Sequence, residues 1–314
     1  MTPDNQLLQR MLLIRAYEEH LSALHAQGPF AMTCSSQGQE ASAVGVVDAL
    51  SDDDLILTNH RSAGHLLARG ADPARLLGEL MGRANGYCKG KSGALHISAR
   101  ELGVVLTSTI VGGELAMAPG VALAQRQLGR SGIVACFFGD GAATEGIFHE
   151  ALNLAALWEL PLLFVCENNQ WQALVPRREA MVGDEVAPWA AGHGIAHRTV
   201  DGNDVRAVRE AAEAARAHIA STGKPYLLET WTYRQNGHYS GDDGAHIDPA
   251  ERLAWRARDP IDRLAAQLRD EGRLDEAGLQ ALRDGARQRI AAAHECALAA
   301  PETPTTELMT DVYA

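Results

Sequence analysis

The 314-residue sequence predicts an α/β protein with a doubly wound, mostly parallel sheet and a helical C-terminal tail. Two continuous apolar runs, Ile133–Phe138 and Leu162–Cys166, have the pattern of strands buried on both faces of a parallel sheet. Between them, apolar residues recur at helical spacing from Thr144 to Glu159. Strand, helix and strand therefore form a βαβ unit at the centre of the chain.

The segments on either side continue the alternation of helices and strands. Asp4–Gln27 has Leu and Ile at helical spacing and ends before Gly28-Pro29, as a helix should. Arg83–Thr109 contains several spaced glycines and no persistent period, which predicts a long functional loop. The other expected elements are, in chain order, a helix that begins after Gly38 and includes Leu50, a strand over Leu55–Leu57, a helix over Asp204–Ser221, a strand over Pro225–Tyr233, and C-terminal helices over Pro249–Glu271 and Asp275–Ala299. We expect one domain over residues 1–314, with residues 249–314 as a helical extension.

Composition and charge narrow the class of protein. The chain is 46% hydrophobic but has no run of eighteen or more apolar residues and no basic, apolar leader, so we expect a soluble, cytoplasmic protein without a membrane span. Its 28 Lys and Arg against 40 Asp and Glu give a net charge of −12, which argues against nucleic acid as a ligand. The five cysteines form no C-x-x-C pair, which is typical of reduced thiols in a cytosol.

Polar residues follow the two buried strands of the βαβ unit. Asp140 lies in Gly139-Asp140-Gly141 directly after the first strand, and Asn169 follows the second. Because the carboxyl ends of parallel strands meet at one edge of a sheet, a carboxylate and an amide oxygen come together there, as a magnesium ion requires, while Gly141 and Ala142 offer backbone N–H groups at a helix start. The alternative is that Asp140 only caps the following helix and that Asn168-Asn169 is a turn.

The same residues carry a resemblance to a known family. Gly139-Asp140-Gly141 followed, after twenty-six residues, by Asn168-Asn169 resembles the thiamine-diphosphate motif, and the surrounding sequence resembles the alpha subunits of 2-oxo acid dehydrogenases. The resemblance extends over essentially the whole chain and implies the thiamine-diphosphate-binding fold. Other segments that match in the family's order are Ser36–Gly45, His60–His65, Gly90–Ile97 and Thr232–Asp243.

The resemblance also implies a role for individual residues. It implies that Mg²⁺ is held by Asp140, Asn169 and the Trp171 carbonyl, and that His238 is the catalytic side chain, which as an imidazole titrates near neutrality. The positions that it implies for the cofactor are Arg61, Gly139, Gly141, Ala142 and Arg234 for the diphosphate, and the backbone from Thr109 to Val111 for the aminopyrimidine. The alternatives are that Arg61 and Arg234 are surface charges, that His238 is an ordinary loop histidine, and that His96 only orders its loop.

By this resemblance the function is that of the alpha subunit of a thiamine-diphosphate-dependent 2-oxo acid dehydrogenase, the component that decarboxylates the substrate and passes an acyl group to a lipoyl-bearing acyltransferase. It implies a beta subunit, in a heterotetramer of two alpha and two beta chains, which supplies the carboxylate that activates the cofactor. A chain acting alone would need Glu40 or Glu114 for that role. Acetoin dehydrogenase, a split transketolase-like or acyloin-forming enzyme, and a non-catalytic assembly subunit are the alternatives.

Several positions depart from the family pattern and leave the substrate open. Cys34 and Ala63 stand where pyruvate- and acetoin-type members usually carry histidine, and Asn236 stands where a histidine is common. Ala63 resembles the branched-chain enzymes, whereas the loop over Gly90–Ile97 resembles the pyruvate and acetoin ones. Tyr239 occupies the position of the family's loop serine, so regulation by phosphorylation there does not carry over.

Overall fold

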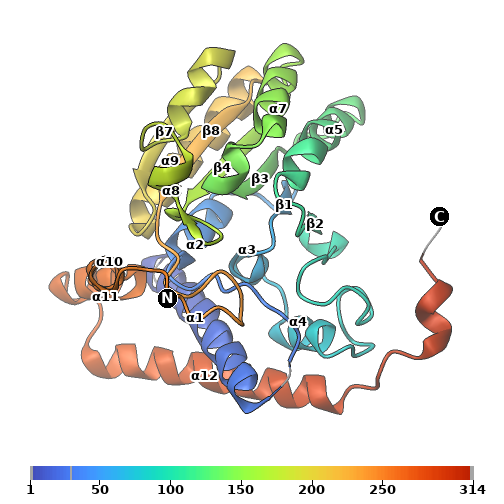
Figure 1. Cartoon of the computed structure of the whole chain (residues 1–314), viewed down its shortest axis with the longest axis vertical. Helices are drawn as coiled ribbons and strands as arrows, with labels where there is room; N and C mark the ends of the chain where they lie inside the picture. Colours follow the sequence, from blue (N-terminus) through green and yellow to red (C-terminus); the bar gives the residue numbers. More distant parts are fainter. Residues whose placement is uncertain (1–2, 29, 312–314) are drawn as a thin grey trace.

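A six-stranded parallel sheet forms the centre of the protein. The structure is a computed structural model that describes residues 3–28 and 30–311. The strand order is β2-β1-β3-β4-β8-β7, and every neighbouring pair is parallel, which confirms the predicted fold class (Figure 1). The strands are β1 (Leu55–Thr58), β2 (Val104–Thr107), β3 (Val134–Gly139), β4 (Leu162–Asn168), β7 (Ala196–Asp201) and β8 (Tyr226–Trp231).

Helices cover both faces of this sheet, because alternate side chains of the central strands point to opposite sides. In β3, Cys136 and Phe138 pack in one core cluster, whereas Ala135 and Phe137 pack in the other. The first cluster includes α5 (Gly113–Gln127) and α7 (Gly146–Leu157). The second includes α1 (Pro3–Gln27), α2 (Glu40–Asp48) and α9 (Val205–Thr222). The sheet is therefore buried on both sides, as its apolar strands predict.

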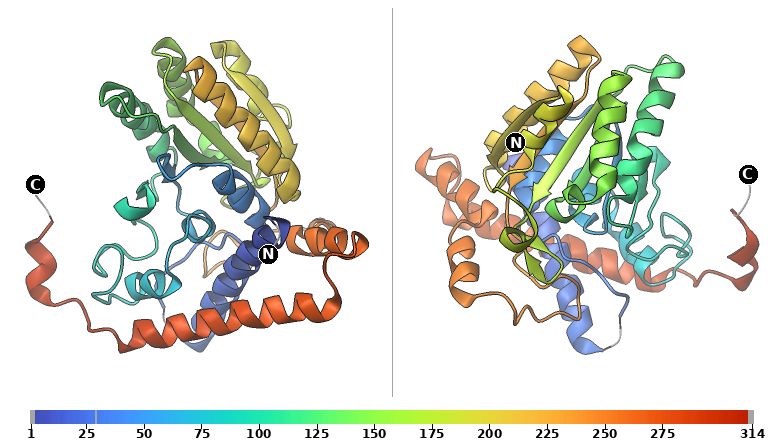
Figure 2. Two further views of the ribbon diagram at one scale, coloured as in Figure 1. Left: turned by 180° about the vertical axis from the view of Figure 1, so that it is seen from behind. Right: turned by 45° about the horizontal axis from the view of Figure 1, so that its top comes forward.

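The C-terminal helices form an outer layer against α1. The expected helix over Pro249–Glu271 is two helices, α10 (Pro249–Arg256) and α11 (Pro260–Asp270), because Asp259 caps a new helix whose first residue is Pro260. Helix α12 (Glu276–Ala299) contacts α1 and α4 (Pro73–Leu80) on the side of the molecule away from the sheet (Figure 1; Figure 2, left). None of the helices in the described residues is long and apolar enough to cross a membrane.

The segment over Arg83–Thr109 is not a loop throughout, and this part of the prediction was wrong. It contains the short helix η1 (Arg100–Leu102) and strand β2, which adds to the edge of the sheet. The preceding loop folds around the buried carboxylate of Glu79, which accepts hydrogen bonds from the N–H groups of Cys88, Gly90 and Ser92 at 2.7–3.0 Å. The sequence pattern did not show β2 because this short strand follows the glycine-punctuated stretch directly, with Gly103 immediately before it.

Candidate active site

A cavity of about 260 Å³ lies beyond the carboxyl ends of the central strands. After β1 the chain forms β2 on one side of it, and then β3 on the other side. The carboxyl ends of β1 and β3 therefore form a topological switch point, which is where open α/β sheets bind their ligands. Nine residues that the sequence singled out line this cavity: Arg61, Val111, Gly139, Asp140, Gly141, Ala142, Asn169, Trp171 and His238. The structure therefore brings these residues together in one cavity from distant parts of the chain.

Asp140 is a buried carboxyl with one oxygen that has no hydrogen-bond partner among the described residues. It is 1% exposed and begins the short helix α6 (Asp140–Ala143), whose cap residue is Gly139, so its side chain does not cap that helix. Its Oδ1 accepts a hydrogen bond from the N–H of Asn169 at 3.3 Å, while no described residue pairs with Oδ2. Burial raises the pKa of Asp140 to about 6. A cation at Oδ2 would stabilise the charged form.

Asn169 and Trp171, which line the same cavity as Asp140, supply two further oxygens. Asn169 Oδ1 accepts a hydrogen bond from the Trp171 N–H at 3.2 Å. Trp171 belongs to the two-residue strand β5 (Trp171–Gln172) and is opposite Pro176 of β6 (Val175–Pro176). The next pair is hydrogen-bonded, from the Arg177 N–H to the Gln170 carbonyl, so the alternation of an antiparallel ladder turns the Trp171 carbonyl away from β6. The described residues contain no group of three His, Cys, Asp or Glu side chains that could hold a metal ion. The oxygens that this cavity offers to a metal are therefore one carboxylate, one side-chain amide and one backbone carbonyl. Such a set of oxygens fits a hard cation such as Mg²⁺.

Arg61 and Arg234 are two buried cations near the cavity. Arg61 is 5% exposed and Arg234 is fully buried, yet in the described part of the chain neither forms an ion pair with a carboxylate. Arg61 donates to the Ser35 carbonyl at 2.6 Å, and Arg234 donates to the Ala173 carbonyl at 2.8 Å. Burial, then the charge of Arg61, lowers the pKa of Arg234 to about 10. Unpaired buried cations are costly, so a bound anion would stabilise both side chains.

His238 lies between these two guanidinium groups. Its Nδ1 is 3.3 Å from Arg61 Nη2 and 3.4 Å from Arg234 Nη1. Since arginine can only donate, Nδ1 accepts and the neutral ring carries its proton on Nε2. Burial, then Arg61 and Arg234, lowers the pKa of His238 to about 4. The expectation that this imidazole titrates near neutrality is therefore wrong: at pH 7 it is a neutral donor.

Two of the predicted cofactor residues do not line the cavity. Arg234 lies behind Ala173 and His238, and Thr109 lies outside the wall to which Val111 and Gly112 contribute. The Thr109 hydroxyl is 3.0 Å from His96 Nε2, so His96 ties the glycine-rich loop to the segment that ends at Val111. Their proposed roles toward a cofactor stay predictions.

Four further polar residues of the wall bear on the site, three of them without a role assigned from the sequence and the fourth, Glu114, considered only for a chain acting alone. Gln39 accepts from Asn169 Nδ2 at 3.2 Å, but its own Nε2 has no partner within the described residues. Glu114 is 1% exposed, burial raises its pKa to about 7, and its Oε2 is likewise without a described partner. The other two are His60 and Glu167. Gln39 and His60 stand inside the matching segments Ser36–Gly45 and His60–His65, which is the signal that pointed to them.

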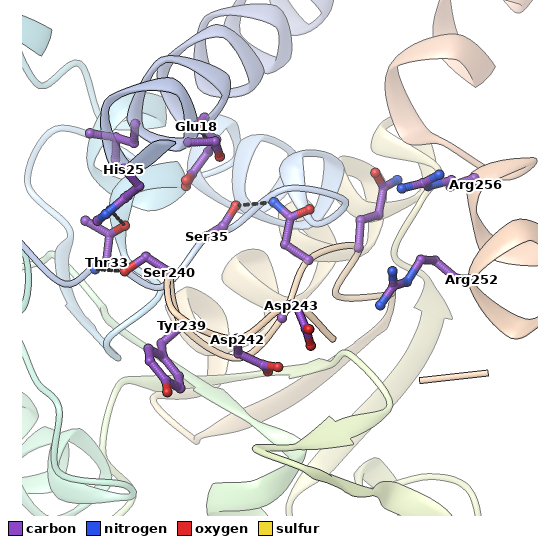
Figure 3. A pocket seen from close by; sticks show the side chains of 15 residues that line it. Glu18, His25, Thr33, Ser35, Tyr239, Ser240, Asp242, Asp243, Arg252 and Arg256 are labelled. Atoms are coloured by element: carbon purple, nitrogen blue, oxygen red, sulfur yellow. Dashed lines mark hydrogen bonds between the residues drawn. The ribbon is translucent and has the colours of Figure 1, made fainter. Parts of the chain in front are cut away.

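A second cavity of about 230 Å³ lies behind the loop that carries His238 (Figure 3). Arg252 and Arg256 of α10 line one side of it, and Glu18 and His25 of α1 line the opposite side. Its wall contains Tyr239 and none of the residues predicted for the cofactor. Unlike the first cavity, its described wall contains no buried carboxyl oxygen without a hydrogen-bond partner.

The fold and this cavity define an α/β protein with a candidate ligand site at the switch point of its sheet. Residues 8–306 match the family described as the dehydrogenase E1 component. The chain therefore belongs to this family, whose enzymes depend on thiamine diphosphate, which confirms the predicted resemblance and fold.

Several curated proteins are similar to the chain along nearly its whole length. It is 38% identical to the alpha subunit of acetoin:2,6-dichlorophenolindophenol oxidoreductase of Bacillus subtilis, covering 98% of this chain and 92% of that one. The pyruvate dehydrogenase E1 component subunit alpha of Rhizobium meliloti is 35% identical, over 98% and 89%. The human mitochondrial 2-oxoisovalerate dehydrogenase subunit alpha is 32% identical, over 98% and 70%. These relatives confirm that the chain is an E1 alpha subunit of the 2-oxo acid and acetoin dehydrogenase type.

Proposed function

We propose that the cavity binds thiamine diphosphate through Mg²⁺ and that the chain acts in decarboxylating a 2-oxo acid and transferring its acyl group to a lipoyl-bearing acyltransferase. One observation carries this proposal: the buried Asp140 Oδ2, which has no partner in the described chain, lines a cavity that also contains Arg61, a cation without an ion pair. A metal ion and a diphosphate would satisfy both.

Each group of residues has a distinct task in this proposal. Asp140, Asn169 and the Trp171 carbonyl hold Mg²⁺. The residues for the diphosphate are Arg61, Gly139, Gly141, Ala142 and Arg234, and the backbone from Thr109 to Val111 meets the aminopyrimidine. The cofactor supplies, when bound, the carbon nucleophile and the electron sink for decarboxylation. His238 presents its Nε2–H to the substrate carbonyl oxygen, and losing one such donor typically costs about 3 to 4 kcal/mol of barrier.

A beta subunit completes the site in this proposal. Apolar side chains that extend from two cavity walls are exposed: Ile110 at 69% and Val111 at 52% on one, Leu174 at 57% and Val175 at 45% on the other. Apolar surface of this kind beside a cofactor cavity favours a covering partner, and obligate interfaces commonly bury more than about 2,000 Å². We expect a heterotetramer of two alpha and two beta chains.

Acetoin is a second candidate substrate. Two observations favour it: the 38% identity with the Bacillus subtilis acetoin:2,6-dichlorophenolindophenol oxidoreductase subunit, and the loop over Gly90–Ile97. Ala63 favours a branched-chain 2-oxo acid instead. The three substrate classes therefore belong in one assay.

The test is to purify the chain alone and together with its beta partner, and to measure reduction of an artificial electron acceptor with pyruvate, branched 2-oxo acids and acetoin. We expect no turnover from the chain alone and thiamine- and Mg²⁺-dependent turnover from the complex. Full activity of the chain alone would refute the proposal that the site is shared with a beta subunit. The activating carboxylate would then be assigned to Glu114, because Glu40 is fully buried in an ion pair with Arg15 and does not line the cavity. Glu114→Gln would then abolish that activity.

A further inference from the structure

The turn that carries the Trp171 carbonyl has an unfavourable backbone conformation. Gln170 has a φ of 73° and Ala173 a φ of 51°, so non-glycine residues adopt the left-handed region on both sides of Trp171-Gln172. Such residues cost free energy and persist only where surrounding contacts hold them. The contacts of this turn therefore decide where the Trp171 carbonyl lies.

One carboxylate oxygen from helix α10 holds this turn. Glu251 Oε1 accepts a hydrogen bond from Trp171 Nε1 at 2.8 Å and another from the Tyr233 hydroxyl at 2.8 Å. Trp171 and Tyr233 are 5% and 1% exposed, so both donors would be buried without a partner if the carboxylate were removed. Tyr233 immediately precedes Arg234 in the chain. A single acceptor thus joins the turn to the segment that carries Arg234.

Helix α10 has few other attachments. None of its residues is fully buried. Its other contacts include the stacking of Trp255 on Tyr233, with ring centroids 5.1 Å apart, a hydrogen bond from Arg252 to the Gly244 carbonyl, and an ion pair of Glu251 Oε2 with the exposed Arg178 at 3.6 Å. The hydrogen bonds of Glu251 therefore link a surface helix to the floor of the cavity. Nothing in the helical periodicity of Pro249–Arg256 requires a glutamate that points inward.

We propose that Glu251 is a positioning residue, which acts through Trp171 and Tyr233 to hold the Trp171 carbonyl and Arg234 in place for Mg²⁺ and the diphosphate. The inference rests on the proposed function. The role needs only an acceptor oxygen at this position, because both donors to Oε1 are neutral and the ion pair of Oε2 with Arg178 is exposed and 3.6 Å long, so it should contribute little. Glutamine, which keeps such an oxygen, should therefore serve nearly as well as glutamate.

The test uses the alpha–beta complex and calorimetric titration of thiamine diphosphate at several Mg²⁺ concentrations. We expect Glu251→Ala to raise the cofactor's dissociation constant on the order of tenfold, because two hydrogen bonds are lost. Glu251→Gln should restore it to within about twofold. Leu253→Ala, on the same helix and 69% exposed, is the matched control and should bind as the wild type does.

A double-mutant cycle separates this role from a general loss of stability. Trp171→Phe keeps the backbone carbonyl but removes the indole donor, so it should weaken binding as Glu251→Ala does, and the two changes together should add little to either. Unchanged cofactor affinity in Glu251→Ala and Trp171→Phe would overturn the inference, even with a lowered unfolding temperature. Failure of the wild-type complex to bind thiamine diphosphate would instead contradict the proposed function. If Glu251→Ala does not fold, Trp171→Phe and Glu251→Gln decide the question.

Discussion

Two buried charged regions of the molecule differ in how completely their charges are paired. Where α1, α2 and α11 meet, Arg15 donates to Glu40 at 2.6 Å and to Asp259 at 2.8 Å. Glu40 also accepts from the Gly38 N–H, and Asp259 also accepts from Gln235 and caps α11. At the cofactor cavity, by contrast, Asp140 Oδ2 has no partner in the described chain and Arg61 has no ion pair there. The folded chain satisfies the first region by itself and leaves the second incomplete.

This difference separates structure from function. A buried polar group without a partner lowers the free energy of unfolding, and proteins retain such groups chiefly where a ligand or reaction requires them. The paired region should therefore respond to mutation through stability. Substitutions in the cavity should instead change the affinity for the ligand. Without a ligand, the charged groups of the cavity should lower the stability of the fold.

The largest effect on stability is expected for Arg15→Ala. Removing the guanidinium leaves the fully buried Glu40 and the buried Asp259 without their cation, which typically costs about 3–5 kcal/mol in the free energy of unfolding. Urea unfolding of the complex measures this change in the free energy of unfolding. Arg10→Ala is the control, because the pair of Arg10 with Asp48 is partly exposed and should contribute less than about 1 kcal/mol. Equal losses of stability in Arg15→Ala and Arg10→Ala would contradict the claim that the buried ion pairs of Arg15 matter more than the partly exposed pair of Arg10.

Asp140→Asn should change stability in the opposite direction. Its folded pKa of about 6 lies above the 3.8 of an unperturbed aspartate, so the charged form is disfavoured in the fold and stability without ligand decreases as pH rises from about 4 to 6. At pH 7 the substitution should therefore stabilise the ligand-free chain by up to about 3 kcal/mol and abolish Mg²⁺-dependent cofactor binding. Thermal unfolding between pH 4 and 8 and calorimetry test both effects. A destabilised variant that still binds the cofactor would contradict the account.

Arg234→Ala should weaken the cofactor without abolishing its binding. A hydrogen bond to a charged group is worth about 1.5–3 kcal/mol, so we expect a roughly thirtyfold higher dissociation constant for thiamine diphosphate. Arg198→Ala removes the same charge from an exposed position on β7 and serves as the control. If cofactor affinity is normal and only substrate saturation changes, Arg234 belongs to the substrate pocket.

The sequence predicted the part of the fold that is locally encoded. Strands β3 and β4 are apolar throughout because both faces are buried, and this placed Asp140 and Asn169 at one sheet edge. Strand β7 was missed because it lies at the sheet edge with mostly exposed or half-buried residues, and α5 because Gly113, Pro119 and Gly120 disguise its helical pattern.

The site was predictable where a residue follows a strand or belongs to a matching segment, and not where it depends on distant contacts. The pairing of Arg15 with Asp259 spans 244 residues, and Trp171 with Glu251 spans 80. The neutral state of His238 follows from two arginines that meet only in the folded chain. Such contacts are consequences of packing, so periodicity and spacing carry no signal for them.

The central claim is that Asp140, Asn169 and the Trp171 carbonyl hold the metal of the cofactor. Crystals of the alpha–beta complex grown with Mn²⁺ in place of Mg²⁺ and thiamine diphosphate allow the metal to be located by anomalous scattering. The account predicts an anomalous peak in the first cavity, bounded by Asp140 Oδ2 and the Asn169 and Trp171 oxygens. A peak elsewhere, such as in the second cavity beside Asp242 and Asp243, with none at Asp140, would contradict it.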